Sequence, residues 1–528
     1  MPRVPPPLYP LAGANTITRR SFLVGTASFA AAALLSPRLR ALTATRVPGG
    51  LFTLGVASGD PAPDGMVLWT RLAPRPLEAG GGMPAEPVEV HWEIAEDEAM
   101  SRVVQRGTAT ADPAWAHSVH VEVAGLRAER WYWYRFRAGG ETSPVGRTRT
   151  LPPPDALPDR LRFAFVSCQK YEIGYYTAFE HLAREDLDLV VHLGDYIYEK
   201  GDDDRAVRPH GQKEIFSVDD YRARYALYKT DPALQAAHAM APWIVTWDDH
   251  EVSNNYANDQ FAKPGVFTSA EFLLRRAAAY QAYYEHMPLR RSALPRGPDM
   301  LLYRRLHYGR LASFHVLDTR QYRSDQPLHD GERAPDPVLL DPQGTMLGDR
   351  QREWFFGGLA ASSSVWNVIA QQVMVGRLDY HPGRDMRLAM DKWSGYEFER
   401  RRLLRELRDG RAKNPVVITG DIHCNWANQL ATDFDAPDAP PVAVEFVGTS
   451  VTSGGDGRPK FDEPDAVLAD NPFVKFFNDE RGYVSCEVTP TAWRTHYRTV
   501  LFVSRRGAPL NTRATFVVES GRPLLLRA

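Results

Sequence analysis

The feature that most constrains this chain is an apolar run of strand length that recurs and each time ends in polar side chains. Four of these runs are RFAFVSCQ, DLVVHLGD, APWIVTWDDHE and NPVVITGDIH, and SFHVLDTR and WNVIAQQVMV share the form. The polar residues that end the first four are Cys168, Asp195, Asp249, His250, Asp421 and His423. Short apolar runs separated by helical segments predict a layered α/β domain, in which strand ends meet at one edge of a sheet.

Helical patterns fill the gaps between the runs. Segment 269–288 begins with Ser269 and Glu271 and stops at Pro288, and segment 395–411 has one apolar face and one charged face. A short amphipathic stretch, TAFEHLARED, separates the first two apolar runs. A strand, a helix and a second strand in this order predict a βαβ unit with parallel strands.

The segment from residue 47 to 150 has a different character, because it alternates polar and apolar residues in short strands. VEVHWEI, HVEV and the aromatic stretch 125–138 show this period of two. The last of these resembles the late strand of a fibronectin-type or immunoglobulin-like sandwich, in which a tyrosine sits at a strand corner. We expect Trp131 to Tyr134 to pack in and around a core, with a carbohydrate-stacking surface as the alternative.

The chain has 528 residues, which is longer than one hydrophobic core usually supports, and this length predicts two domains. The proline-rich segment LPPPDALPD at 151–159 reads as the linker between them. We therefore expect a small β-sandwich domain at 47–150 and a catalytic α/β domain at 160–528.

The first 44 residues predict an export signal. Arg19 and Arg20 precede an apolar run from Phe22 to Leu35, which is too short to span a bilayer. Paired arginines before such a run resemble a twin-arginine signal, whose partner is the twin-arginine translocase. We expect cleavage near Ala44, no stable membrane anchor afterwards, and a periplasmic or extracellular location.

Charge and cysteine content exclude two classes of protein. Lys and Arg number 63 against 65 Asp and Glu, and nucleic-acid-binding proteins usually carry a basic excess. We therefore expect no nucleic-acid partner. Three cysteines do not make a disulfide framework, and their odd number leaves at least one thiol unpaired by a disulfide.

The polar strand ends together predict a metal centre. An aspartate at a strand end is by itself more often a turn or helix cap, and a single histidine is more often structural. Here carboxylates, an imidazole, the Cys168 thiol and the Tyr198 phenol are expected at one edge of one sheet. This joint pattern favours metal binding over independent structural roles.

Seven ordered motifs give the chain a specific resemblance. They are FTLGVASGDP, VLWTR, FVSCQ, VVHLGDYIYE, WDDHEVSNNY, VLDTRQYR and TGDIHCNW. With these motifs the chain resembles the alkaline phosphatase D family of the calcineurin-like metallophosphoesterase superfamily. The resemblance implies a four-layer αββα metallophosphoesterase core preceded by a small fibronectin- or immunoglobulin-like β-sandwich.

The resemblance also implies roles for single residues. Asp195 is expected to bridge two ions, and Tyr198, His423 and Cys168 are expected to bind the more acidic one. Cys168 stands where many members of the superfamily have an Asp-x-His motif, which is a departure from that pattern. His250 is expected to face the scissile phosphate and to act as an acid or as a stabiliser of negative charge.

The second ion is expected to be a hard cation, which means one that prefers oxygen ligands to nitrogen and sulfur. Asp249 stands at the asparagine of the superfamily's Gly-Asn-His motif, and Asp421 stands at the first histidine of its Gly-His-x-His motif. Anionic oxygen ligands favour calcium or magnesium over zinc, and the resemblance to the family implies calcium. The expected cofactors are therefore iron(III) and one or two calcium ions.

Three further residues are candidates for contact with phosphate. Asn254 and Asn255 follow His250 in a short loop, and either phosphate or calcium contacts or a plain turn explain them. Arg320 is a candidate phosphate clamp, with a buried structural ion pair as the favoured alternative.

The expected function is a secreted phosphohydrolase that cleaves phosphomonoesters and phosphodiesters by attack of a hydroxide held by the metal ions. A specialised phospholipase D-like enzyme or nucleotide phosphodiesterase is one alternative. The other is a non-catalytic, metal-binding secreted protein.

Overall fold

The computed structural model describes residues 50–528 apart from 202–203, 212, 437 and 458–463. The predicted export signal at 1–44 therefore lies outside the described residues. Among the residues that are described, no helix combines the length and the apolar character needed to cross a membrane.

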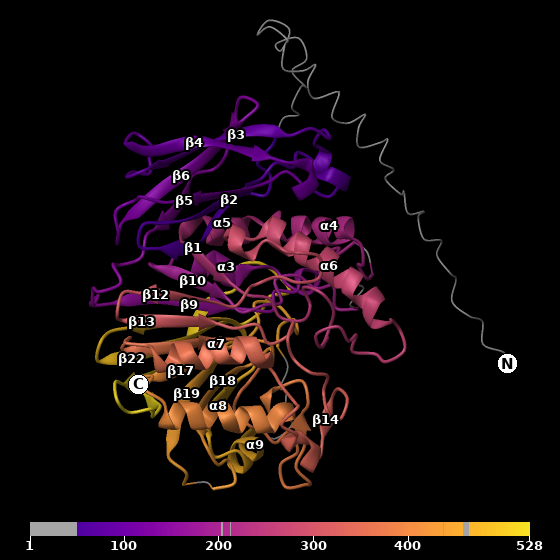
Figure 1. Cartoon of the computed structure of the whole chain (residues 1–528), viewed down its shortest axis with the longest axis vertical. Helices are drawn as coiled ribbons and strands as arrows, with labels where there is room; N and C mark the ends of the chain where they lie inside the picture. The colour runs from indigo at the N-terminus through magenta and orange to yellow at the C-terminus, as the bar shows by residue number, and fades with distance from the viewer. Residues whose placement is uncertain (1–49, 202–203, 212, 437, 458–463) are drawn as a thin grey trace, which may run out of the picture. The chain divides into compact units, whose positions relative to one another are not determined.

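Ten strands form the first of two large sheets (Figure 1). In sheet order they are β24 (Leu526–Arg527), β23 (Leu510–Glu519), β22 (Ala492–Val500), β21 (Arg481–Val488), β9 (Leu161–Val166), β10 (Leu189–His192), β11 (Trp243–Val245), β1 (Val56–Ala62), β2 (Gly65–Arg71) and β5 (Ser118–Val123). The strands β9, β10 and β11 are parallel, as the apolar runs predicted. Their carboxyl ends therefore lie at the same edge.

The second large sheet has seven strands. In sheet order they are β12 (Arg304–Tyr308), β13 (Ala312–Val316), β15 (Trp366–Ala370), β17 (Pro415–Thr419), β19 (Pro441–Val447), β18 (Asn425–Ala431) and β20 (Val474–Asn478). The four strands β13, β15, β17 and β19 are parallel. A separate pair, β14 (Glu332–Arg333) and β16 (Leu388–Ala389), is antiparallel.

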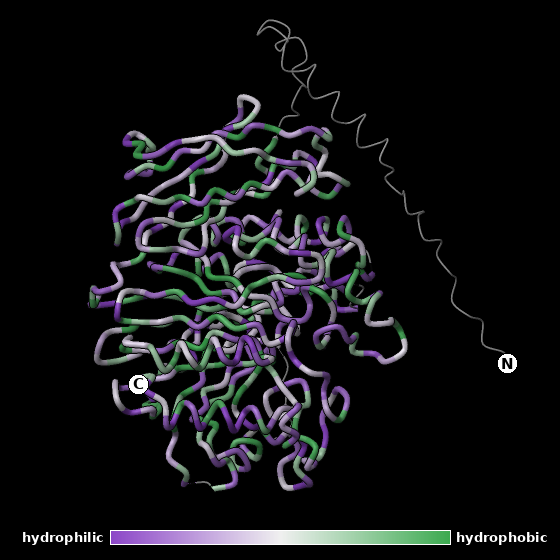
Figure 2. The backbone as a smooth tube through the Cα atoms, viewed as in Figure 1, coloured by the Kyte–Doolittle hydropathy of each residue, from purple (hydrophilic) through white to green (hydrophobic). Residues whose placement is uncertain are grey.

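The two large sheets pack face to face, and β9 shows how its sequence produces this. Side chains alternate across a strand, so Phe163 and Phe165 enter the core between the sheets. Ala164 and Val166 enter a second core on the opposite face. The apolar character of these central strands is visible as green stretches of the tube in Figure 2. A strand that is apolar on both faces is thereby buried on both sides.

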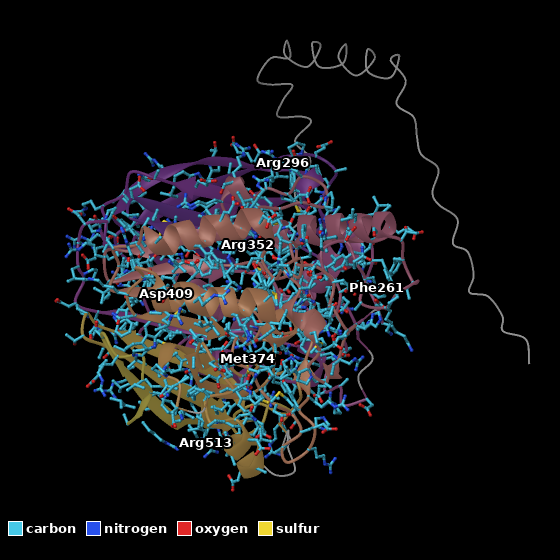
Figure 3. All side chains as sticks on the ribbon, turned by 60° about the horizontal axis from the view of Figure 1, so that its bottom comes forward. Phe261, Arg296, Arg352, Met374, Asp409 and Arg513 are labelled. Atoms are coloured by element: carbon cyan, nitrogen blue, oxygen red, sulfur yellow. The ribbon has the colours of Figure 1, made fainter. Side chains whose placement is uncertain are left out.

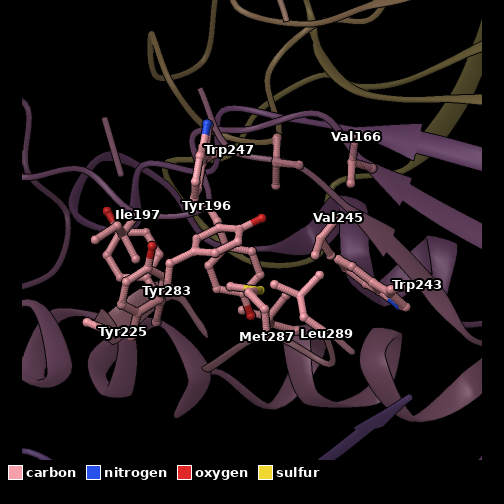
Figure 4. Close-up of a cluster of buried hydrophobic side chains, with 14 of the residues drawn as sticks. Val166, Tyr196, Ile197, Tyr225, Trp243, Val245, Trp247, Tyr283, Met287 and Leu289 are labelled. Atoms are coloured by element: carbon pink, nitrogen blue, oxygen red, sulfur yellow. The ribbon is translucent and has the colours of Figure 1, made fainter. Parts of the chain in front are cut away.

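Helices cover both outer faces. The second core packs α3 (Thr177–Leu182), α4 (Val218–Lys229), α5 (Pro232–Met240) and α6 (Ser269–His286) against the ten-stranded sheet. Figure 4 shows part of this core, including Tyr196, Tyr225 and Trp243. The helices α7 (Gly348–Ala360) and α8 (Glu397–Asp409) cover the seven-stranded sheet, and Figure 3 labels Arg352 and Asp409 on them. A last short helix is α9 (Pro464–Asp470). The predicted four-layer αββα core is confirmed.

The N-terminal segment contributes a five-stranded sheet made of β3 (Val88–Ala95), β4 (Val103–Ala111), β6 (Trp131–Ala138), β7 (Glu141–Thr142) and β8 (Gly146–Arg149). In Figure 1 it lies at the indigo end, next to β2 and β5. The strands β1, β2 and β5 of the same segment belong instead to the ten-stranded sheet, where Gly59 pairs with Trp243. The sandwich and the core therefore share one sheet, and the domain boundary at 151–159 stays a prediction.

The strand β6 has the predicted tyrosine corner. The Tyr132 hydroxyl donates to the Arg127 carbonyl at 3.3 Å and accepts from the Arg127 amide at 3.1 Å. Tyr132 and Tyr134 are buried, which confirms packing as their role. The ring of Trp131 is covered by the Arg147 guanidinium, 3.5 Å from the ring centroid, so this face is not an open sugar platform.

The predicted start of α6 at Ser269 is confirmed, and one predicted helix end differs from the structure. The N-cap of α6 is Thr268, whose hydroxyl accepts from the Glu271 amide, and Ser269 is the first helical residue. The helix α3 ends at Leu182, short of the predicted end at Asp186.

Candidate metal centre

Four strand ends meet at this site. Cys168 follows β9, Asp195 follows β10, and Asp249 and His250 follow β11, all in the ten-stranded sheet. His423 follows β17 of the facing sheet. The site therefore lies where the carboxyl ends of parallel strands from both large sheets come together, as ligand sites of open α/β sheets do.

Two glycines allow these loops to approach one another. A Cβ on Gly194 would lie 2.5 Å from the Asp248 backbone nitrogen, and Gly194 has φ 110°. A Cβ on Gly420 would lie 2.5 Å from the Ser167 hydroxyl. Any larger residue at these positions would push apart the loops that carry Asp195 and His423.

The backbone of the site is strained. Cys168, Asp195, Asp421 and His423 have φ of 58°, 56°, 65° and 62°, and Asn255 has 53°. Residues other than glycine rarely adopt this left-handed region, and such residues cluster at functional sites. Tight loops therefore aim these side chains at a cost in backbone energy.

The first group of candidate ligands is Cys168, Asp195 and His423, each of which offers an atom within 4.8 Å of the other two. Tyr198 completes it. Its hydroxyl lies 2.7 Å from Asp195 Oδ2, 3.1 Å from His423 Nε2 and 2.7 Å from the Ser453 hydroxyl. The structure thus brings together all four side chains that the sequence assigned to the more acidic ion.

The second group is Asp195, Asp249 and His250, which meet the same distance limit. Asp195 is the member that both groups share. A carboxylate common to two adjacent ligand sets is the arrangement that a bridging ligand requires.

The described surroundings leave three of the donor groups, Cys168, Asp195 and Tyr198, with a raised pKa and therefore favour their uncharged forms. Burial, reinforced by Asp195, raises the pKa of the Cys168 thiol and of the Tyr198 phenol well above their usual ranges. Burial also raises the pKa of Asp195 well above its usual range. Asp195 Oδ1 and Asp248 Oδ2 are buried without a hydrogen-bond partner among the described residues. Bound cations would stabilise the anionic forms and satisfy such oxygens, so the donor set fits metal ions.

Asp421 lies outside both groups. Its carboxylate accepts a hydrogen bond from the Lys392 ammonium, and the Arg320 guanidinium is 3.6 Å from Asp421 Oδ1. Burial disfavours the ammonium, but Asp421 and Asp391 outweigh this and raise the pKa of Lys392 above its usual range. Asp421 therefore borders the second group here, and its role as a ligand stays a prediction.

Arg320 is fully buried in ion pairs. Its guanidinium bonds to Asp248 and, at 2.8 and 3.0 Å, to both oxygens of Asp391. It is 3.9 Å from Asp249 Oδ2. This geometry corresponds to the structural ion pair, the favoured alternative, and it ties the loop after β11 to the loop after β13.

The two asparagines have distinct surroundings. The backbone amide of Asn254 donates to Glu199 Oε1 at 2.9 Å. The backbone amide of Asn255 donates to Asp249 Oδ2 at 2.6 Å, and the side-chain nitrogen of Asn255 donates to Asp330 at 2.8 Å. Asn255 thus holds the Asp249 carboxylate in place, and its own side chain is engaged away from the two ligand groups.

Sequence reasoning missed two glutamates that position the site. Glu199 Oε2 lies 2.6 Å from His250 Nδ1, and Glu251 accepts the amides of Asp195, Tyr196 and Asp248 at 3.1, 2.6 and 2.9 Å. Both occur in the quoted motifs, VVHLGDYIYE and WDDHEVSNNY. The signal for Glu199 was an acidic residue at the end of a mostly apolar motif. The signal for Glu251 was an acidic residue next to the candidate metal ligands Asp249 and His250.

The His250–Glu199 pair is charged. Burial opposes charge on His250, but Glu199, Asp249 and Asp195 outweigh it and raise the pKa of His250 well above its usual range. Burial likewise opposes charge on Glu199, but His250 and the Asn254 amide lower the pKa of Glu199 to about 2. Both shifts favour an imidazolium bound to a carboxylate.

Comparisons with known proteins agree with this geometry. Residues 163–497 match the family described as PhoD-like phosphatase, and residues 39–152 match its N-terminal domain. The chain belongs to the PhoD-like phosphatase family. It is 50% identical over 516 residues to alkaline phosphatase D of Bacillus subtilis (strain 168), covering 96% of this chain and 88% of that relative. A solved structure described as "Structure of PhoD" matches with a TM-score of 0.88 and 51% identity, covering 90% of this chain and 92% of that one.

Membership in this family confirms the resemblance inferred from the motifs. The protein is a PhoD-type alkaline phosphatase, an enzyme that hydrolyses phosphoric esters. This membership favours the enzyme over the alternative of a non-catalytic binding protein.

Proposed function

We propose that this phosphatase is a secreted, metal-dependent enzyme that hydrolyses both phosphomonoesters and phosphodiesters. The observation that carries the metal assignment is that Asp195 belongs to two adjacent groups of candidate ligands. Cys168, Asp195, Tyr198 and His423 would hold iron(III). Asp195 and Asp249, with Asp421 beside them, would hold one or two calcium ions.

The chain's own residues prepare the substrate phosphate for attack. The ions, when bound, neutralise phosphate charge and make water a stronger nucleophile. His250 gives Nδ1 to Glu199, so its other ring nitrogen is the one left for a phosphate oxygen. As an imidazolium it can stabilise developing negative charge or protonate the leaving oxygen.

The surrounding residues hold this arrangement rather than react. Glu251 fixes the backbone of Asp195 and Asp248, and Arg320 anchors the Asp248 carboxylate. The Asn254 side chain is the proposed polar contact for phosphate, because its backbone is already fixed by Glu199. Asn255 instead orients Asp249.

Metal analysis combined with an activity assay tests the proposal. The purified enzyme should contain iron and calcium and should cleave p-nitrophenyl phosphate and bis(p-nitrophenyl) phosphate. Asp195→Asn should lower both the metal content and both activities by more than about 100-fold, because even indirect partners of metal ligands contribute 10–100-fold. The control is Asp385→Asn, an exposed position outside the site. An active enzyme without bound metal would overturn the proposal.

We also propose export by the twin-arginine route, on the strength of Arg19 and Arg20 ahead of a short apolar run. Replacing both with lysine should leave the precursor in the cytoplasm in a fractionation experiment. Unchanged export would remove this route while leaving the enzymatic proposal intact.

A further inference from the structure

A cavity of about 830 Å³ lies away from the candidate metal centre. It is bounded by β5, by the 3-10 helix η3 (Pro113–Trp115), by the C-terminal end of α6 and by the segment that follows it. None of its lining residues belongs to the metal centre. Its volume falls within the range typical of small-molecule sites.

One wall of this cavity is an aromatic corner. The rings of His120 and Tyr284 stack on each other, with centroids 4.5 Å apart and an interplanar angle of 18°. Trp115 meets Tyr284 edge to face, at 5.9 Å and 70°. Since the two parallel rings already contact each other, they leave no slot between them for a planar base. The corner instead suits a ligand that lays an apolar face on one ring.

The polar side chains that line the cavity include hydrogen-bond donors and an acceptor, which is what a ligand with hydroxyl groups requires. His120 Nε2 lies 2.9 and 3.0 Å from the carbonyl oxygens of Tyr284 and Met287, so the ring proton sits on Nε2. Its Nδ1 is then an acceptor with no partner among the described residues. The Trp115 indole N–H and the Arg291 guanidinium are donors that likewise have no partner there. Three of the lining residues thus bring two donors and one acceptor to the cavity, namely Trp115, Arg291 and His120.

The charges around the cavity disfavour an anionic ligand. Burial lowers the pKa of His120 to about 4, so its ring is neutral near pH 7. Asp112 and Glu122 line the same cavity as Arg291. Glu122 also pairs with Arg290 at 3.4 Å, so two cations meet two carboxylates and the cavity has no excess of positive charge to attract an anion.

We propose that this cavity is a binding site for a neutral carbohydrate, separate from the site of phosphoester hydrolysis. A pyranose ring presents a face of C–H groups, which packs on an aromatic ring, and hydroxyls that both donate and accept. Trp115 supplies the ring and one donor, His120 supplies the acceptor, and Arg291 supplies a second donor. The sugar binds either as a free oligosaccharide or as part of a polysaccharide.

The test uses the full mature chain and three neutral probes, cellotetraose, maltotetraose and chitotetraose, in isothermal titration calorimetry. At least one should bind at millimolar concentration. Trp115→Ala should weaken that binding at least about tenfold, as removal of an aromatic anchor does, and Arg291→Met, an exposed substitution, should weaken it less. Both variants should keep wild-type activity on p-nitrophenyl phosphate, which shows that they are folded.

The matched control is Trp131→Ala, because Trp131 lies on β6 outside the cavity with its ring under Arg147. It should bind the probe like the wild type. Co-sedimentation with insoluble cellulose and chitin separates the polysaccharide source from the free oligosaccharide. Failure of all three probes to bind, or equal losses in the Trp115 and Trp131 variants, would overturn the proposal.

Discussion

Lys229, the last residue of α4, is a buried lysine that forms no ion pair among the described residues. Its ammonium nitrogen lies 4.2 Å from the ring centroid of Trp69 and 5.4 Å from that of Tyr196. Burial lowers the pKa of Lys229 from 10.5 to about 7. Aromatic faces attract the cation, but they do not replace a carboxylate or water. The folded protein therefore carries a cost whenever Lys229 is protonated.

We predict that Lys229→Met stabilises the protein at pH 6. There both the folded and the unfolded wild type hold the proton, so the folded state bears the full cost of the buried charge. The change in pKa from 10.5 to about 7 corresponds to ~5 kcal/mol. The lost cation–π contact offsets about 2 kcal/mol of this. The variant should therefore gain ~3 kcal/mol in the free energy of unfolding.

The gain should fade as the pH rises. Between pH 7 and 10.5 the unfolded wild type still binds the proton and the folded wild type does not, so this group makes the wild type more stable with rising pH. Urea unfolding of both proteins at pH 6 and pH 10 measures the difference. Lys475→Met, at an exposed position on β20, is the control and should show no such change. A gap that is the same at both pH values, or a variant less stable at pH 6, would refute the reasoning.

Three further predictions concern the metal centre. Tyr198→Phe should remove the visible absorption band that a phenolate bound to iron(III) would give the purified enzyme. The control Tyr303→Phe should keep this band. A colourless, iron-free but active wild type would contradict the assignment. Glu199→Gln should lower kcat about 10–100-fold with metal content unchanged, because a group that orients an active-site histidine has effects of this size; an unchanged kcat would separate Glu199 from His250 function. A calcium chelator should abolish activity while iron and colour remain, and calcium should restore activity better than zinc does; equal rescue by zinc would show that the second ion is not chosen by hard oxygen ligands.

The sequence predicted the parts of the site that depend on strand ends. Cys168, Asp195 and Asp249 each follow an apolar run, and parallel strands place such residues at one edge whatever the loops do. His423 follows the same rule from the facing sheet. These positions were predictable because apolar periodicity is a strong local signal.

The parts that were missed depend on contacts between distant loops. Lys392 lies just after β16, outside any strand-end motif, and reaches Asp421 only through the folding of that loop. The pattern around Lys392 carries no local signal of this contact. Arg320 was recognised as a candidate, but its role followed from the carboxylates that surround it, which the sequence places 71 and 72 positions away.

The balance of buried charge supports the proposal that this site binds metal ions. Arg320 and Arg323 are buried, Lys392 is partly exposed, and these three cations contact Asp248, Asp391 and Asp421. Asp195 and Asp249 remain as further carboxylates of the ligand groups. Buried carboxylates are costly unless paired, and Asp249 is partly paired because Arg320 lies 3.9 Å from its Oδ2. Asp195, whose Oδ1 has no hydrogen-bond partner among the described residues, is the carboxylate that the proposed metal ions would neutralise. The residues that stabilise the loops would thus also set how much charge the proposed metal ions neutralise.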